Sequence, residues 1–118
     1  MILLNQASIW HWTQREDCTN RNLSIGYWQA ARVYALVGDG DNARNAAKLS
    51  MQNTSEDEPF YLGYAYEALA RAEFVDGNKA EAKAHVAKAK NLLERITDAD
   101  SKKWLSDDLA ELESNLQL

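Results

Sequence analysis

Apolar residues recur at every third or fourth position along most of the chain, which is the spacing of one face of an α-helix. Near the end of the chain they form a leucine stripe, and Asp107 and Glu111 lie on the opposite, polar face. The stripe consists of Leu105, Leu109, Leu112 and Leu116. The β-branched residues are sparse, and they do not alternate with polar residues over any window of strand length. The pattern therefore predicts an all-α protein.

Glycine, proline and polar stretches divide this pattern into six helical segments. The helical pattern stops at Gly38 and at Asp76-Gly77, and Gly38 suits the left-handed residue that ends many helices. Pro59, the only proline, suits the first turn of a helix, where its missing N–H costs little. The predicted antiparallel helices span about residues 2–16, 23–37, 41–52, 59–75, 78–96 and 99–116.

Charge and composition narrow the classes of function. The 118-residue chain has a formal net charge of −5, so it lacks the basic surplus with which proteins neutralise nucleic-acid phosphates. Lysines between residues 79 and 90 alternate with alanine, which is typical of a solvated helix face. No apolar run is long enough for a membrane span, and the first residues lack the pattern of a signal peptide. We therefore expect a cytoplasmic protein that binds neither nucleic acid nor membrane.

Two parts of the chain resemble each other. In each, an aromatic-rich helix ends in glycine, and an alanine follows five residues later: Gly38 with Ala43, and Gly77 with Ala82. The two glycines are 39 residues apart (77 − 38). Self-similarity at such a period indicates stacked helical hairpins, in which small residues let neighbouring helices approach closely.

The repeated pattern resembles the tetratricopeptide repeat (TPR), although the late proline of that motif is absent from both copies. The matching positions of the first copy are Tyr27, Ala31, Tyr34, Gly38, Ala43, Ala47 and Ser50. Those of the second copy are Tyr66, Leu69, Ala70, Gly77, Ala82, Val86 and Ala89, and Glu73 replaces the usual aromatic residue. The resemblance implies a single domain, residues 1–118. It would hold repeats at about 24–57 and 63–96, an N-terminal helix, and a C-terminal capping helix at about 99–116.

A second resemblance covers shorter stretches. Residues 59–73, the pair His11-Trp12 and the run Tyr27-Trp28-Gln29 are similar to a set of small, uncharacterised bacterial helical proteins. This resemblance implies no activity.

In TPR-like hairpins the first helix of each repeat lines a concave groove, so the resemblance implies a groove that holds a protein or peptide. The groove residues it assigns are Trp28, Arg32, Tyr64, Glu67 and Arg71, flanked by Ile25, Leu36 and Val75. Arginine suits bidentate capture of a carboxylate, so we expect a carboxylate-bearing peptide or a small acidic ligand. The alternative is an internal ion pair of Glu67 with Arg71 or Arg32 that only orders the hairpins.

Trp10, His11 and Trp12 form a possible interface. Consecutive helical residues point about 100° apart, so the three side chains cannot all be buried on one face. They are expected to contact a partner or a second copy, or else to pack as a lid on the following helices. A homodimer through this segment, with Leu3 and Leu4, is a further hypothesis.

No motif predicts catalysis, a metal site or a cofactor. The two histidines, His11 and His85, and the single cysteine, Cys18, do not have the spacing of a metal site. A weakly catalytic or ligand-sensing pocket that combines His11 with Trp28, Tyr64, Glu67 and Arg71 stays as an alternative. The leading expectation is a non-enzymatic interaction module.

Overall fold

The structure, a computed structural model, describes residues 20–116. All regular structure in this range is α-helical, which confirms the predicted all-α class: α2 Asn20–Leu36, α3 Gly40–Gln52, α4 Pro59–Val75, α5 Lys79–Leu93 and α6 Ala99–Leu116. The predicted helix at residues 2–16, with Trp10, His11 and Trp12, lies outside the described residues.

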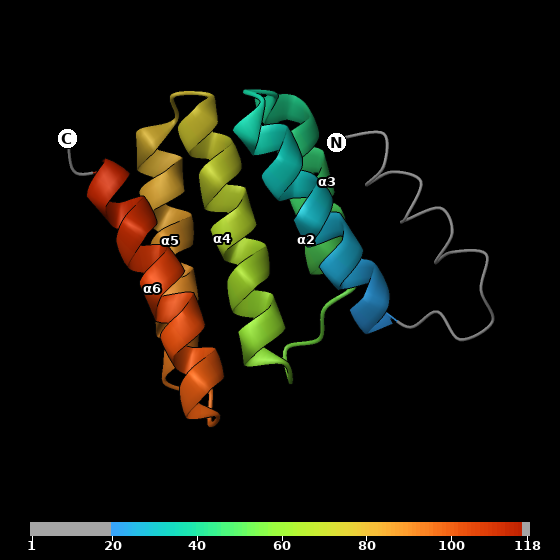
Figure 1. Cartoon of the computed structure of the whole chain (residues 1–118), viewed down its shortest axis with the longest axis vertical. Helices are drawn as coiled ribbons and strands as arrows, with labels where there is room; N and C mark the ends of the chain where they lie inside the picture. Colours follow the sequence, from blue (N-terminus) through green and yellow to red (C-terminus); the bar gives the residue numbers. More distant parts are fainter. Residues whose placement is uncertain (1–19, 117–118) are drawn as a thin grey trace.

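The five helices lie in two layers (Figure 1). Helices α2, α4 and α6 lie side by side, while α3 packs behind α2, and α5 lies behind α4 and α6. Each helix contacts the next along the chain, and α4 also contacts both α2 and α6. Within the described chain α3 and α5 do not contact each other. Helix α4 is therefore the centre of the molecule.

The two predicted hairpins end their first helices in the same way. Gly38 and Gly77 have φ angles of +82° and +81°, a conformation that strains any residue with a Cβ atom. Asp39 N–H donates to the Tyr34 carbonyl at 2.9 Å, and Asn78 N–H to that of Glu73 at 2.8 Å. These bonds satisfy carbonyls that would otherwise be left unpaired at the helix end. The predicted helix stops at both glycines are confirmed.

Small residues bring the helices together. Ala43, Ala47 and Ala82 have no solvent exposure, and they pack against α2 and α4 from the second layer. Gly63 on α4 has a similar role toward α6, because a Cβ atom there would lie 2.5 Å from Leu105 Cδ2. The leucine stripe of α6 is fully buried, which confirms it as the apolar face of this helix.

Some helix limits differ from the prediction. Helix α2 begins at Asn20 instead of about Leu23, and α5 ends at Leu93 instead of about Ile96. The N–H of Ile96 donates to the Leu93 carbonyl at 3.1 Å, a tight final turn that ends the α-helical pattern. Ile96 still packs in the core, which explains why its apolar side chain continued the predicted helix.

Glu73, at a position where the TPR resemblance led us to expect an aromatic residue, belongs to a buried polar network. Glu73 is buried and accepts a hydrogen bond from Arg44 of α3 at 2.5 Å and one from the Asn78 side chain at 2.8 Å. Arg44 also binds Asp76 at the end of α4. This network lowers the pKa of the Glu73 carboxyl, mainly through its bond with Arg44, and ties the first hairpin to the second.

Candidate functional site

The five predicted groove residues come together between α2 and α4. On α2, Trp28 and Arg32 are four residues apart and share a helix face. On α4, Tyr64, Glu67 and Arg71 are separated by three and four residues and also share a face. Since α2 packs against α4, the two faces meet.

Glu67 is the centre of this cluster. Its carboxylate has no solvent exposure, and each oxygen has its own donor. Trp28 Nε1–H donates to Oε2 across the helix interface at 3.2 Å, and Arg71 Nε–H donates to Oε1 within α4. A buried carboxylate is stable only when it is paired and hydrogen-bonded, and here both conditions hold. The predicted internal pair of Glu67 with Arg71 is present.

The indole of Trp28 connects the remaining members. Its ring meets Tyr64 edge to face at a centroid distance of 5.3 Å, an arrangement that aromatic pairs favour. The Arg32 guanidinium carbon lies 5.5 Å from the centroid of the same ring, within the range of cation–π attraction. Trp28 thus holds Arg32 beside the cluster.

Tyr64 extends the cluster to the third helix of the layer. Its hydroxyl donates to Asp108 Oδ2 of α6 at 2.7 Å. Burial, helped by this hydrogen bond, raises the pKa of Tyr64 well above its usual value, so the hydroxyl stays protonated. Asp108 is a site contact that the sequence pattern did not indicate, because it depends on the close approach of α6 at Gly63.

Two arginines keep unused donors in this region. Arg32 forms no hydrogen bond or ion pair with any residue in the range 20–116, and its side chain is partly exposed. Nη2 of Arg71 is buried and has no hydrogen-bond partner among the same residues. A guanidinium has five N–H donors and prefers a carboxylate in a two-point contact. Because Arg71 Nη2 is buried, the unpaired donors that solvent can reach belong to Arg32.

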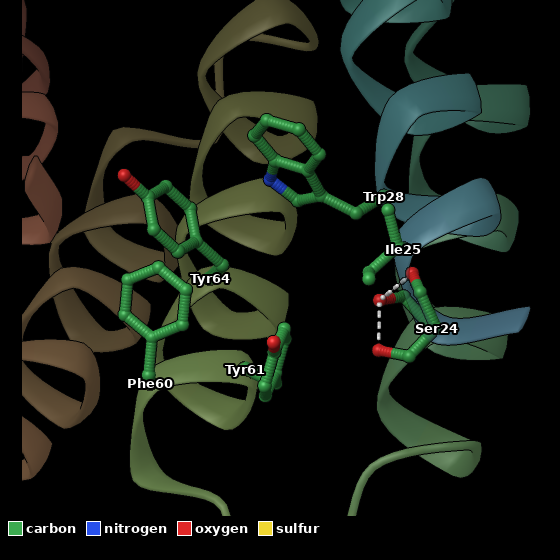
Figure 2. A pocket seen from close by; sticks show the side chains of 7 residues that line it. Ser24, Ile25, Trp28, Phe60, Tyr61 and Tyr64 are labelled. Carbon is green, nitrogen blue, oxygen red and sulfur yellow. Dashed lines mark hydrogen bonds between the residues drawn. The ribbon is translucent and has the colours of Figure 1, made fainter. Parts of the chain in front are cut away.

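An apolar pocket of about 280 Å³ lies next to Trp28, between α2 and α4. Figure 2 shows the indole reaching from α2 toward α4, with Phe60, Tyr61 and Tyr64 on the other side of the space. The residues that line the pocket are Ser24, Ile25, Trp28, Ser50, Phe60, Tyr61 and Tyr64. Phe60 meets Tyr64 edge to face at 5.1 Å, so the aromatic wall is a packed unit.

The serine hydroxyls that line this pocket are hydrogen-bonded within the chain. Ser50 Oγ donates to the Ser24 carbonyl at 2.8 Å, and Thr54 Oγ1 donates to the Ser50 carbonyl at 2.7 Å. Ser24 Oγ lies 2.7 Å from Thr54 Oγ1 and 3.2 Å from Ser50 Oγ. With these hydroxyls paired, the pocket presents an almost wholly apolar surface.

The flanking predicted residues have different positions. Ile25 lines the pocket, whereas the side chain of Leu36 is 72% exposed at the end of α2. Phe60 and Tyr61 were not among the predicted site residues. Their signal in the sequence is the aromatic run that follows Pro59, whose helical spacing brings Phe60 and Tyr64 to one face.

The described residues contain neither a cluster of metal ligands nor a membrane-crossing helix. Within residues 20–116 no three His, Cys, Asp or Glu side chains converge as ligands for a metal ion. Among the helices of the same range, none has the length and apolar character that a membrane crossing requires. No protein-family description, curated protein or solved structure matches this chain.

Proposed function

We propose that the chain is a TPR-like interaction module that binds a carboxylate-bearing peptide on the face of α2 and α4. The observation that supports this most strongly is the convergence of Trp28, Arg32, Tyr64, Glu67 and Arg71 on one face, with arginine donors left over.

The helix arrangement supports the TPR-like part of the proposal. The first helices of the hairpins, α2 and α4, lie in one layer with α6, and the second helices, α3 and α5, lie in the other without touching. Both hairpins turn at a left-handed glycine. In this arrangement α6 covers the open side of the second hairpin, as a capping helix does.

The Glu67–Arg71 pair has a structural role within the proposal. It leaves Arg32 as the arginine most available to a partner, because that guanidinium is partly exposed and has no carboxylate partner in the described chain. The aromatic ring beneath it limits its motion, so less rotamer freedom is lost when it binds. We therefore assign the main contact with the peptide carboxylate to Arg32.

A peptide-display selection against the full-length protein tests the proposal. We expect the selected peptides to contain a carboxylate and to bind the Arg32→Gln variant at least tenfold more weakly, because a charge-assisted bond is worth about 1.5–3 kcal/mol. Lys102→Gln is the matched control, since Lys102 is exposed on α6. Unchanged affinity of every selected peptide for Arg32→Gln and Trp28→Phe would refute the proposed function.

A small acidic ligand is the second candidate. The observation that favours it is the pocket of about 280 Å³, close to the lower limit for small-molecule sites. Both carboxylate oxygens of Glu67 accept hydrogen bonds within the chain. This arrangement favours a site that binds a ligand over one in which Glu67 transfers a proton.

A further inference from the structure

We infer that the pocket beside Trp28 receives a ring-sized apolar side chain of the bound peptide, close to the carboxylate that Arg32 contacts. This inference rests on the proposed function, because it assigns a second part of the same ligand. It adds a requirement for an aromatic or large aliphatic residue to the requirement for a negative charge.

The volume and lining of the pocket support a ring. A dry cavity of about 150 Å³ lined by apolar side chains binds benzene. The present pocket, at about 280 Å³, has room for a ring together with the atoms that join it to a main chain. Ile25, Phe60 and Tyr64 offer the ring apolar contacts. The hydroxyls of Ser24 and Ser50 are already hydrogen-bonded within the chain, so they hold water in the pocket only weakly.

The position of Arg32 limits the distance between the ring and the carboxylate of the ligand. Trp28 lines the pocket and also contacts Arg32, whose guanidinium carbon lies 5.5 Å from the centroid of the Trp28 ring. An apolar group in van der Waals contact with the indole, about 4 Å away, is then within about 10 Å of that carbon. About three extended residues cover this distance. The carboxylate therefore belongs to the same residue as the ring or to a near neighbour.

The opposite end of the pocket is closed to a second anion. Arg21 lies over the Tyr61 ring at 4.8 Å, and it already forms an ion pair with Glu58 at 2.7 Å. That bond lowers the pKa of Glu58, so the pair remains charged and mutually neutralised at neutral pH. The ligand is thus oriented, with its anionic group toward Arg32 and its apolar group between α2 and α4.

Three small probes separate the two parts of the ligand. N-acetylphenylalanine has a ring and a carboxylate, its amide has only the ring, and N-acetylalanine has only the carboxylate. Titration of the full-length ¹⁵N-labelled protein by NMR, followed at the Trp28 indole N–H, measures each affinity. The pocket predicts that both ring-bearing probes bind, that N-acetylalanine binds at least tenfold more weakly than N-acetylphenylalanine, and that the probe ring gives NOEs to Phe60 and Tyr64.

Ile25→Phe fills the pocket from its own wall and is expected to weaken both ring-bearing probes at least tenfold. Gln29→Phe is the matched control, because Gln29 is exposed on the same helix and does not line the pocket. The NOEs to the unaltered protein decide the question even if Ile25→Phe folds poorly.

The failures of the two proposals can be told apart. Equal binding of N-acetylphenylalanine and N-acetylalanine, both sensitive to Arg32→Gln, would overturn the pocket and support the proposed function. Equal binding of the acid and the amide, both insensitive to Arg32→Gln, would support the pocket and count against the carboxylate contact. NOEs from Trp10 or Trp12 to Ile25 and Tyr64, with no binding of any probe, would overturn the pocket by identifying the chain itself as its occupant.

Discussion

At the residue scale, two carboxylates within residues 20–116 are buried, and each forms an ion pair with an arginine. Glu67 is paired with Arg71 inside α4, and Glu73 is paired with Arg44 across the two hairpins. Both glutamates belong to α4, so the central helix contains charges as well as alanine. A buried ion pair adds little net stability, but removal of one member leaves an uncompensated charge and is strongly destabilising.

This asymmetry gives a prediction for Glu67 and Arg71. Arg71→Met is expected to lower the free energy of unfolding by about 3–5 kcal/mol, because it leaves the buried Glu67 carboxylate without its cation. The double variant with Glu67→Met is expected to lie within about 2 kcal/mol of wild type, since two apolar side chains replace the pair. Urea unfolding of the two variants measures both values. Losses that simply add up would contradict the structural role of the pair.

His85 makes the stability depend on pH. Burial lowers its pKa below the usual 6.5, and its Nδ1 is buried with no hydrogen-bond partner among residues 20–116. As the pH falls from 6.5 toward the folded-state pKa, the unfolded chain takes up a proton that the folded chain does not. The free energy of unfolding should therefore decrease with falling pH in this interval. His85→Gln should show a shallower decrease, and identical slopes would refute the assignment. His11 is common to both proteins.

At the scale of elements, the repeat is carried by two turns with the same backbone geometry. Gly38 and Gly77 have left-handed φ angles, and a Cβ atom at either position would meet nothing within 4 Å. The requirement for glycine at these positions is thus conformational and not steric.

Substitution of either glycine tests this repeat. Gly38→Ala and Gly77→Ala are each expected to lower the free energy of unfolding by about 1–2 kcal/mol, the cost of a left-handed residue with a Cβ atom. Asn tolerates this conformation, so Gly38→Asn and Gly77→Asn should lose less. Thermal unfolding with matched calorimetry gives the values. A loss at only one of the two sites would argue against equivalent turns.

The limits of the helices could be predicted where the residues that determine them are close together in the sequence. Glycine stops, Pro59 and the leucine stripe of α6 predicted the described helices within a few residues. The predicted end of α5 was wrong. Ile96 is apolar because it packs in the core after the helix has ended, not because the helix continues to it. Long-range contacts such as Arg44 with Glu73, or Tyr64 with Asp108, have no local signal, since each joins residues from helices distant in sequence.

The convergence of the site was predictable only through the repeat. Placing Trp28 and Glu67 on the first helices of two hairpins predicted that both would lie on one face, and a hydrogen bond joins them across the interface of α2 and α4. The pocket beside them was missed, because its size depends on the separation of α2 and α4 near Ser24 and Phe60. The order of apolar and polar residues in a sequence defines the faces of helices but not the space between them.

At the scale of the whole molecule, the two layers have different surfaces. The layer of α2, α4 and α6 holds the aromatic pocket and the partly exposed Arg32, which has no ion pair within residues 20–116. The groove behind, lined from α3, α4 and α5, contains Asp41, Glu73 and Asp76, which all form ion pairs with Arg44. Three carboxylates thus share one arginine, so this groove does not favour a further carboxylate. We therefore expect the partner to bind to the first layer and not to the second.

Amide shift mapping with a selected carboxylate peptide tests this central expectation most directly. Perturbed backbone signals are predicted to gather in residues 25–36 of α2 and 60–71 of α4, together with the Trp28 indole N–H. The outward-facing residues of α3 and α5 should be unaffected. Perturbations centred on α3 and α5, with the Trp28 signal unmoved, would contradict the account.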